Sequence, residues 1–274
     1  MPERSFPLSP ERLIRLLLLA AALLLVLLLV LTVFHIVATI PKAPDKGDPA
    51  QTTDSLGGQH TEPSEGDGVT LATTPDAGIA YQDDLIFVGD SLTAQLINRG
   101  VLTGGTQTRQ VWRSESGLLN LNAEVTSAKI IFPGTGELMT IAEAADKAEP
   151  AILVITLGAE WGVANLSEAD FTDSYTKLVK AIQKASPKTT IVLQSIFPVS
   201  AGCASLDNAK IDTANRWVRS VAAACECYYL DTQSVLKDEN NHLKEEFSGS
   251  SDGIHLNQLA YETILGYLRT HAVP

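Results

Sequence analysis

The sequence predicts a three-layer α/β/α sandwich around a parallel sheet, because apolar runs and amphipathic stretches alternate along the chain. The clearest runs, continuously hydrophobic rather than alternating, are Asp84–Val88, Ala151–Leu157, Thr190–Leu193 and Cys227–Leu230. Strands buried on both faces have this texture, and such strands occur in parallel sheets covered by helices. Gln107–Trp112 is a weaker strand candidate, so we expect a sheet of about five strands.

The stretches between these runs repeat their apolar residues at helical spacing. Ser167–Ala185 begins with a Ser-x-x-Asp capping signal and ends where Ser186 precedes a proline, since that position avoids the α region. The same reasoning predicts helices at Glu137–Lys147, Asp207–Ala224 and Asn257–His271. Strands that alternate with helices imply right-handed βαβ crossovers, which place helices on both faces of the sheet.

The first part of the chain differs in composition from the predicted sandwich. Leu13–Phe34 is almost wholly apolar, with no charge after Arg15. At about 1.5 Å per residue this stretch can cross a hydrocarbon core of about 30 Å. The basic residues before it predict a cytoplasmic N-terminus at 1–12, a transmembrane signal anchor at 13–36 and an exported C-terminal part. A cleaved signal peptide is the competing interpretation, although its apolar core would be only about 7–15 residues long.

Residues 37–80 are predicted to be a disordered linker, because they are rich in Pro, Gly, Ser, Thr and acidic residues. They contain too little apolar surface to offset the entropy of ordering. Residues 81–274 then form one domain of normal size. The chain has 32 acidic and 20 basic residues and a formal net charge of −12, which disfavours nucleic acid or anionic lipid as a partner.

The three cysteines are Cys203, Cys225 and Cys227, and their odd number leaves at least one thiol unpaired. The helix predicted at 207–224 would separate Cys203 from Cys225 by roughly 25 Å. A disulfide requires Cα atoms within about 7 Å, so we expect buried free thiols. The sequence has no Gly-rich phosphate loop and no Cys/His metal cluster, and we therefore expect neither a cofactor nor a metal.

Two polar segments lie where strands of the predicted sheet run into helices. Gly89-Asp90-Ser91 leaves the first strand, and a serine at a helix N-terminus lies among free N–H groups that stabilise an oxyanion. Capping of the helix by Asp90 or Ser91 alone is the competing interpretation. Asp252 and His255 share a turn before the last helix, where the carboxylate can orient the imidazole to take a proton from a serine.

Together, Gly-Asp-Ser-Leu after the first strand and Asp-x-x-His before the last helix resemble the SGNH, or GDSL, hydrolase family. Its members are esterases, lipases, carbohydrate deacetylases and some acetyltransferases on a flavodoxin-like sandwich. The resemblance spans residues 81–274 and suggests a membrane-anchored bacterial-type member. It implies that Ser91 is the nucleophile, His255 the base and Asp252 the acid that orients it. Asp90 is expected to bind the substrate.

The resemblance also implies an oxyanion hole, where this sequence departs from the family. Gly117 resembles the glycine whose N–H joins that hole together with Ser91. The family's Gly-x-Asn-Asp block is altered here, so that Glu160 takes the asparagine position, or Trp161 if the loop is shifted. An ionised glutamate has only acceptors, and losing one oxyanion donor reduces turnover by about 10²–10³. The indole N–H of Trp161 is another donor, and its ring is a candidate platform for a sugar.

These features predict an extracytoplasmic serine esterase that hydrolyses O-acetyl or other short-chain acyl esters, carried on cell-envelope or extracellular carbohydrate. The expected partners are an acylated small molecule or glycan and, through the N-terminal helix, the membrane. A catalytically weak module that binds glycan or protein is the alternative, supported by Glu160. An O-acetyltransferase would use the same triad and is not distinguished by the sequence.

Overall fold

The computed structural model describes residues 68–159 and 161–274. Its main sheet has the strand order β2-β1-β5-β6-β7, and every neighbouring pair is parallel. The strands are β1 (Leu85–Gly89), β2 (Val111–Trp112), β5 (Ile152–Thr156), β6 (Thr190–Gln194) and β7 (Tyr228–Leu230). The parallel sheet and all five strand positions predicted from the apolar runs are thus confirmed.

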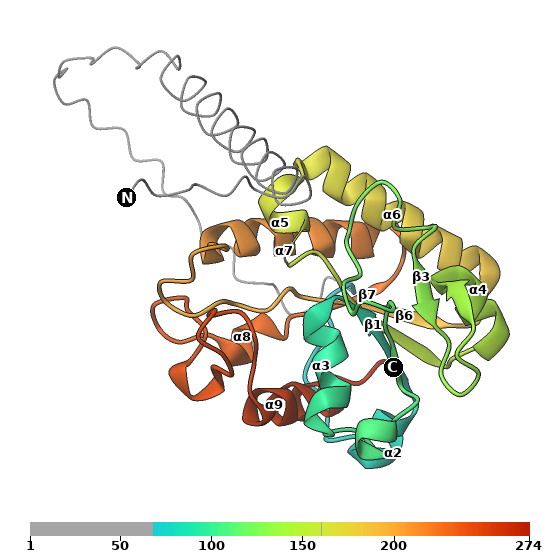
Figure 1. Cartoon of the computed structure of the whole chain (residues 1–274), viewed down its shortest axis with the longest axis horizontal. Helices are drawn as coiled ribbons and strands as arrows, with labels where there is room; N and C mark the ends of the chain where they lie inside the picture. The colour runs from blue at the N-terminus through green and yellow to red at the C-terminus, as the bar shows by residue number, and fades with distance from the viewer. Residues whose placement is uncertain (1–67, 160) are drawn as a thin grey trace, which may run out of the picture. The chain divides into compact units, whose positions relative to one another are not determined.

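Helices cover both faces of this sheet, as the three-layer prediction required (Figure 1). One layer contains α4 (Ile141–Ala148), α6 (Glu168–Ala185) and α7 (Asn208–Ala224), with α6 packed against both neighbours. The other layer contains α2 (Gly78–Asp83), α3 (Ser91–Arg99), α8 (Gln233–Leu236) and α9 (Gln258–Arg269), with α9 packed against the other three. Shorter pieces are α5 (Gly162–Asn165) and the 3₁₀ turns η1 (Gly105–Gln107) and η2 (Glu245–Phe247).

The long helices begin where their capping residues predict. The side chains of Ser167, Asp207 and Asn257 each accept a hydrogen bond from the N–H three residues on, at the starts of α6, α7 and α9. The apolar face of α6 is buried, and Tyr175 on that face donates to the Ile155 carbonyl of the fully buried strand β5 at 3.3 Å. Burial of each large aliphatic side chain stabilises the fold by about 1.5–3 kcal/mol.

The helix predicted at Glu137–Lys147 begins later than expected. Leu138–Thr140 forms β4, which pairs antiparallel with β3 (Lys129–Ile131) in a separate two-stranded sheet. The reason is a capping box, in which Thr140 and Glu143 each bind the other's backbone N–H and fix the start of α4. The Thr140 N–H, followed by Lys129, lowers the pKa of Glu143 to about 2.

The folded domain begins before the boundary predicted at residue 81. Thr70 forms a parallel bridge with Tyr229 at the edge of the sheet, and the Leu71 N–H donates to the Tyr229 carbonyl at 2.9 Å. Leu71 is buried, so this one apolar side chain anchors a stretch whose composition otherwise indicates a linker. Residues 68–80 therefore belong to the domain rather than to a disordered linker.

The predicted N-terminus at 1–12, the signal anchor at 13–36 and the linker up to residue 67 lie outside the described residues. Within residues 68–159 and 161–274, none of the helices combines the length and apolar character needed to cross a membrane.

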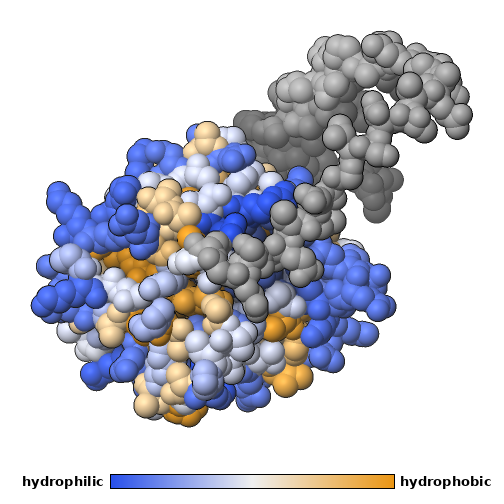
Figure 2. Space-filling view, turned by 180° about the vertical axis from the view of Figure 1, so that it is seen from behind, coloured by the Kyte–Doolittle hydropathy of each residue, from blue (hydrophilic) through white to orange (hydrophobic). Residues whose placement is uncertain are grey.

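Within the described part of the chain, the large apolar side chains that remain exposed come from separate elements. They are Ile79, Leu118, Leu138, Trp161 and Leu259. On the face shown in Figure 2, hydrophobic residues form separate areas bordered by hydrophilic ones. Scattered apolar residues of this kind are normal on a folded domain and do not indicate a docking face.

Candidate active site

The turn from β1 into α3 places Ser91 at a helix N-terminus. Gly89 ends β1, and a Cβ at this position would lie 2.2 Å from the Thr156 carbonyl oxygen and 2.1 Å from the Thr93 hydroxyl. Only glycine fits, because the backbone of β5 and the first turn of α3 approach it so closely. Ser91 follows as the first residue of α3 and is partly exposed.

Asp90 caps α3 and is buried. Its side chain accepts the Leu92 N–H at 3.1 Å, and only 5% of the residue is exposed. The capping alternative describes the position of Asp90, and its burial gives no support to the prediction that it contacts substrate, which stays a prediction. Burial, and then the nearby Asp90 charge, raises the pKa of both Tyr175 and Tyr261, so these phenols stay protonated.

Asp252 and His255 form the hydrogen-bonded pair that the sequence predicted. The distance between His255 Nδ1 and Asp252 Oδ2 is 2.6 Å. The other carboxylate oxygen, Oδ1, accepts the backbone N–H groups of Ile254 at 2.8 Å and His255 at 3.0 Å. One carboxylate therefore shapes the turn and orients the ring. A neutral imidazole beside it carries its proton on Nδ1 and presents Nε2 as a base.

Opposing effects act on the Asp252 carboxyl. Desolvation raises its pKa, but the hydrogen bonds from the His255 ring and from the Ile254 and His255 N–H groups together outweigh this effect and lower it. The net pKa is below the ordinary value, so Asp252 is ionised at neutral pH. An ionised carboxylate stabilises the imidazolium that forms when His255 takes a proton.

Two hydrogen bonds connect α3 to the C-terminal part of the chain, one to helix α9 and one to the residue after His255. The Tyr261 hydroxyl donates to the Leu92 carbonyl at 2.7 Å, and Arg99 Nη2 donates to the Leu256 carbonyl at 2.8 Å. Leu92 adjoins Ser91, and Leu256 adjoins His255. Each hydrogen bond thus fixes the neighbour of a predicted catalytic residue. Neither Arg99 nor Tyr261 stands out in the sequence, because both connections span more than 150 positions.

Gly117 lies beside α3 but differs from the prediction in one respect. A Cβ on Gly117 would lie 4.0 Å from the Ala94 Cβ, which places the residue next to the first turns of α3. Its N–H, however, donates to the Ser114 carbonyl at 3.0 Å. This is the i to i+3 hydrogen bond of a β-turn, and it occupies the proposed oxyanion donor. In this conformation the Gly117 N–H is therefore engaged with Ser114, and its role at an oxyanion stays a prediction.

The altered third block is described only in part. Glu160 lies outside the described residues, so its role stays a prediction. Trp161 is 46% exposed, while its carbonyl accepts both the N–H and the side-chain amide of Asn165. An exposed ring on a fixed backbone is suited to stacking against a sugar, as predicted for Trp161. Trp112 is buried and Trp217 packs on the core, so neither ring offers a face of this kind.

A buried polar network holds the loops at the carboxyl ends of the central strands. Thr156 Oγ1 donates to Gln194 at 2.7 Å, Gln194 donates to Thr232 at 2.8 Å, and the Gln233 N–H donates to Ser195 Oγ at 2.8 Å. This network was not predicted, and its sign in the sequence is the polar pair Gln194-Ser195 directly after the apolar run of β6. These bonds satisfy polar groups that would otherwise be costly to bury, and they fix the edge of the sheet where the site lies.

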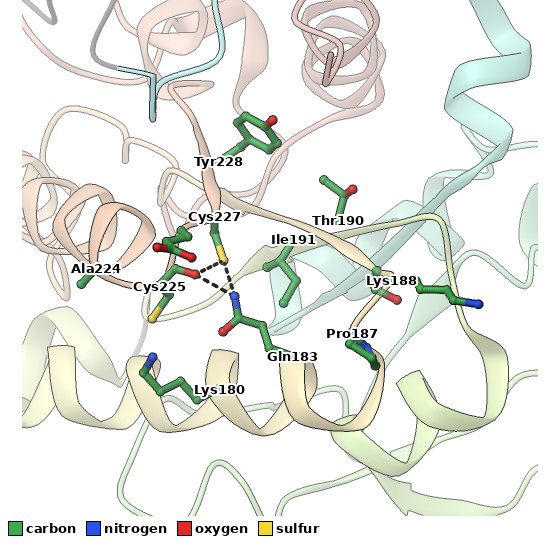
Figure 3. A pocket seen from close by; sticks show the side chains of 12 residues that line it. Lys180, Gln183, Pro187, Lys188, Thr190, Ile191, Ala224, Cys225, Cys227 and Tyr228 are labelled. Carbon is green, nitrogen blue, oxygen red and sulfur yellow. Dashed lines mark hydrogen bonds between the residues drawn. The ribbon is translucent and has the colours of Figure 1, made fainter.

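A cavity of about 640 Å³ lies at the amino ends of the strands, near the starts of β6 and β7 (Figure 3). Lys180, Gln183, Cys225 and Cys227 are among its lining residues, and Gln183 donates to the Cys225 carbonyl at 2.7 Å. Ligands of parallel α/β sheets bind at the carboxyl ends of strands, so this cavity is separate from the candidate site.

All three cysteines are free, as predicted, although Cys203 is only partly buried. Burial raises the pKa of Cys227 to about 12 and also raises that of Cys225. These two thiols are therefore protonated and unreactive at neutral pH.

Comparison with known proteins agrees with this architecture. The family model described as "GDSL-like Lipase/Acylhydrolase family" matches residues 87–263. No curated protein matches this chain.

Similar solved structures share little sequence with this protein. A GDSL-like lipase from Bacteroides thetaiotaomicron is 15% identical, with a TM-score of 0.45 over 69% of this chain and 87% of that one. The periplasmic domain of a lipopolysaccharide acetyltransferase from Salmonella Paratyphi A is 13% identical, with a TM-score of 0.47 over 68% and 82%. A lipase/acylhydrolase from Enterococcus faecalis is 19% identical, with a TM-score of 0.42 over 68% and 93%.

The family model spans more than half of the chain and includes both the β1–α3 turn and the turn that holds Asp252 and His255. The protein therefore belongs to the GDSL-like lipase/acylhydrolase family, the SGNH hydrolases.

Proposed function

We propose that this acylhydrolase is a serine esterase with Ser91 as nucleophile, His255 as general base and Asp252 as its orienting acid. The observation that carries the proposal is the 2.6 Å contact between His255 Nδ1 and Asp252 Oδ2, in a turn tied to the helix that Ser91 begins. A carboxylate that faces Nδ1 leaves Nε2 as the basic atom of the ring, which is the protonation state that activates a serine.

In the proposed reaction, Ser91 Oγ attacks the ester carbonyl carbon while His255 Nε2 takes the hydroxyl proton. The tetrahedral oxyanion then collapses, and the alcohol leaves with the proton from Nε2. A water molecule, deprotonated by the same nitrogen, attacks the acyl–Ser91 ester. Collapse of this second intermediate releases the carboxylic acid and returns the proton to Ser91.

The hydrogen-bond donors that would stabilise the oxyanion are the weaker part of this arrangement. The N-terminus of α3 offers backbone N–H groups and a positive dipole end at Ser91, which favour negative charge. The N–H of Gly117 is engaged with Ser114, and Glu160, or Trp161 if the loop is shifted, stands where the family has an asparagine. We therefore propose that turnover is low compared with a site that has a complete set of donors.

We further propose that the substrate is a short-chain acyl ester, such as an O-acetyl group, on a carbohydrate outside the cytoplasm. The apolar stretch at 13–36 supports a single-pass anchor with the N-terminus in the cytoplasm. The exposed ring of Trp161, beside the altered block, supports a sugar as the alcohol part of the ester.

The test is the hydrolysis of p-nitrophenyl acetate by the full-length chain in detergent. We expect a slow activity that is lost in Ser91→Ala, because no other group replaces the nucleophile. Equal rates for the native chain and Ser91→Ala would remove the esterase assignment.

A second candidate function, a catalytically weak binding module, is favoured by Glu160 and by the occupied N–H of Gly117. Glu160→Asn separates the two functions. The esterase proposal predicts a gain in kcat of up to about 10²-fold when an amide donor is restored. A binding module predicts no activity in either form.

A further inference from the structure

A second cavity, of about 290 Å³, adjoins the turn that holds Asp252 and His255. The Ser200 N–H donates to the Gly253 carbonyl at 2.8 Å. A Cβ on Gly253 would lie 3.2 Å from the Cys203 Cβ, and both Ser200 and Cys203 line the cavity. The wall of the cavity is therefore in direct contact with the proposed catalytic turn, one residue from Asp252.

One buried polar group in the wall of this cavity has no hydrogen-bond partner among the described residues. Ser200 Oγ is buried and has no hydrogen-bond partner among the described residues. The ring of His242 and the side-chain amide of Asn240 also make no hydrogen bond with the described part of the chain, whereas the backbone N–H of each is held by Asp238. An unpaired buried hydroxyl destabilises the folded chain, so a ligand that supplies a hydrogen-bond partner is favoured there.

The charges and apolar groups narrow the class of ligand. Neither lysine nor arginine lines the cavity, so it has no permanently charged cation to neutralise a phosphate or sulfate. The one carboxylate, Asp207, caps α7 by accepting the Lys210 N–H at 3.1 Å. Val199 and Leu206 supply apolar wall beside the donors and acceptors. A compound with several hydroxyl groups and apolar C–H faces satisfies both kinds of surface, whereas a fatty acyl chain would bury the polar groups unpaired.

We propose that this cavity is a subsite for a neutral sugar unit of the substrate, so that the esterase acts on acylated carbohydrate. The inference rests on the proposed function of Ser91 and His255 for its link to catalysis. Sugar binding itself does not depend on turnover, and the two can be measured separately.

Cys203 provides a reporter for this site, because it lines the cavity and its free thiol is partly exposed. Cys225 and Cys227 are buried at the other edge of the sheet and serve as internal controls. The full-length chain is treated with iodoacetamide in the presence of glucose, N-acetylglucosamine or inorganic phosphate, and the alkylation of each cysteine is followed by mass spectrometry.

We expect one or both sugars to slow the alkylation of Cys203, by about tenfold at a concentration ten times the dissociation constant. Phosphate should not slow it, and the rates at Cys225 and Cys227 should not change. Asn240→Ala should weaken the protection, whereas the neighbouring exposed Glu239→Ala should retain it. Protection by phosphate, or no protection by either sugar, would overturn the proposal.

The link to catalysis is tested with the chain alkylated at Cys203. We expect kcat/KM for an O-acetylated monosaccharide to fall at least about tenfold, because the adduct fills the subsite. Labelling of Ser91 by a fluorophosphonate should persist, which shows that the catalytic groups remain intact. Unchanged hydrolysis of the acetylated sugar would reject the subsite. Loss of Ser91 labelling in the unmodified chain would instead reject the proposed function.

Discussion

Replacing Asp252 with asparagine changes only the atom that faces His255. In the structure Asp252 Oδ1 accepts two backbone N–H groups while Oδ2 faces His255 Nδ1. An asparagine oxygen would keep both N–H bonds and would place its NH₂ group against Nδ1. The ring would then carry its proton on Nε2, where it cannot accept the Ser91 proton.

The size of the effect depends on whether the amide can flip. Turning the oxygen toward Nδ1 gives up two N–H hydrogen bonds, each with a net contribution of about 0.5–1.5 kcal/mol. A total of about 1–3 kcal/mol corresponds to a rate loss of about 5- to 150-fold, which is the smallest loss that we expect. If the amide stays in place, the loss approaches the roughly 10⁴-fold cost of the wrong tautomer in serine proteases.

The assay is kcat and KM for p-nitrophenyl acetate, with the full-length chain. The loss should be in kcat, since the ring position and the binding surface are unchanged. Asp238→Asn is the matched control, because Asp238 Oδ1 also accepts two turn N–H groups, from Asn240 and His242, but among the described residues its carboxylate is not hydrogen-bonded to a ring nitrogen. If Asp252→Asn keeps at least half of the native kcat, the assignment of Asp252 as the orienting acid is wrong.

Three further predictions concern stability and positioning. Gly89→Ala should destabilise the fold by about 3 kcal/mol or more in urea unfolding, because the added Cβ would collide with the backbone of β5. Gly266→Ala in α9 is the control and should stabilise by about 0.5–1 kcal/mol, since its Cβ would lie 3.7 Å from the nearest atom, Nη2 of Arg269. If Gly89→Ala leaves the unfolding free energy unchanged, the close packing at Gly89 is wrong. Tyr261→Phe should lower unfolding free energy by about 1 kcal/mol and should lower kcat more than it changes KM, and an unchanged kcat would show that its bond to Leu92 does not position α3. Folding lowers the pKa of Asp252, so its ionised form stabilises the fold above the ordinary value of 3.8, and this stabilisation is lost as the pH falls through the lower folded value. The difference in unfolding free energy between the native chain and Asp252→Asn should therefore shrink below about pH 4. A constant difference down to about pH 2 would contradict the lowered pKa.

Much of the fold follows from local sequence signals. The strands are legible because parallel strands buried on both faces must be continuously apolar, and the starts of α6, α7 and α9 because Ser167, Asp207 and Asn257 cap them. The hairpin of β3 and β4 was missed, since its three-residue strands carry no period that a sequence can show. The early start of the domain was missed because it depends on one residue, Leu71.

The candidate site was predictable to a similar extent. The Asp252–His255 pair is local, so its spacing indicates its geometry, and the structure confirms the contact. The sequence left open whether Asp90 caps the helix or contacts substrate, because it does not reveal which way a polar side chain turns. The engagement of the Gly117 N–H with Ser114 depends on the turn type, which Ser-Glu-Ser-Gly does not specify. Contacts between distant segments, such as that of Arg99 with Leu256, require the folded chain.

The central claim is that Ser91 is a nucleophile activated by the Asp252–His255 pair, and covalent labelling tests it most directly. The full-length chain is treated with a fluorophosphonate and the adduct is located by peptide mass spectrometry. We predict a single adduct on Ser91, which forms rapidly in the native chain, much more slowly in Asp252→Asn, and not at all in Ser91→Ala. Absence of the adduct in the native chain, or its presence at equal rates in Asp252→Asn, would contradict this account.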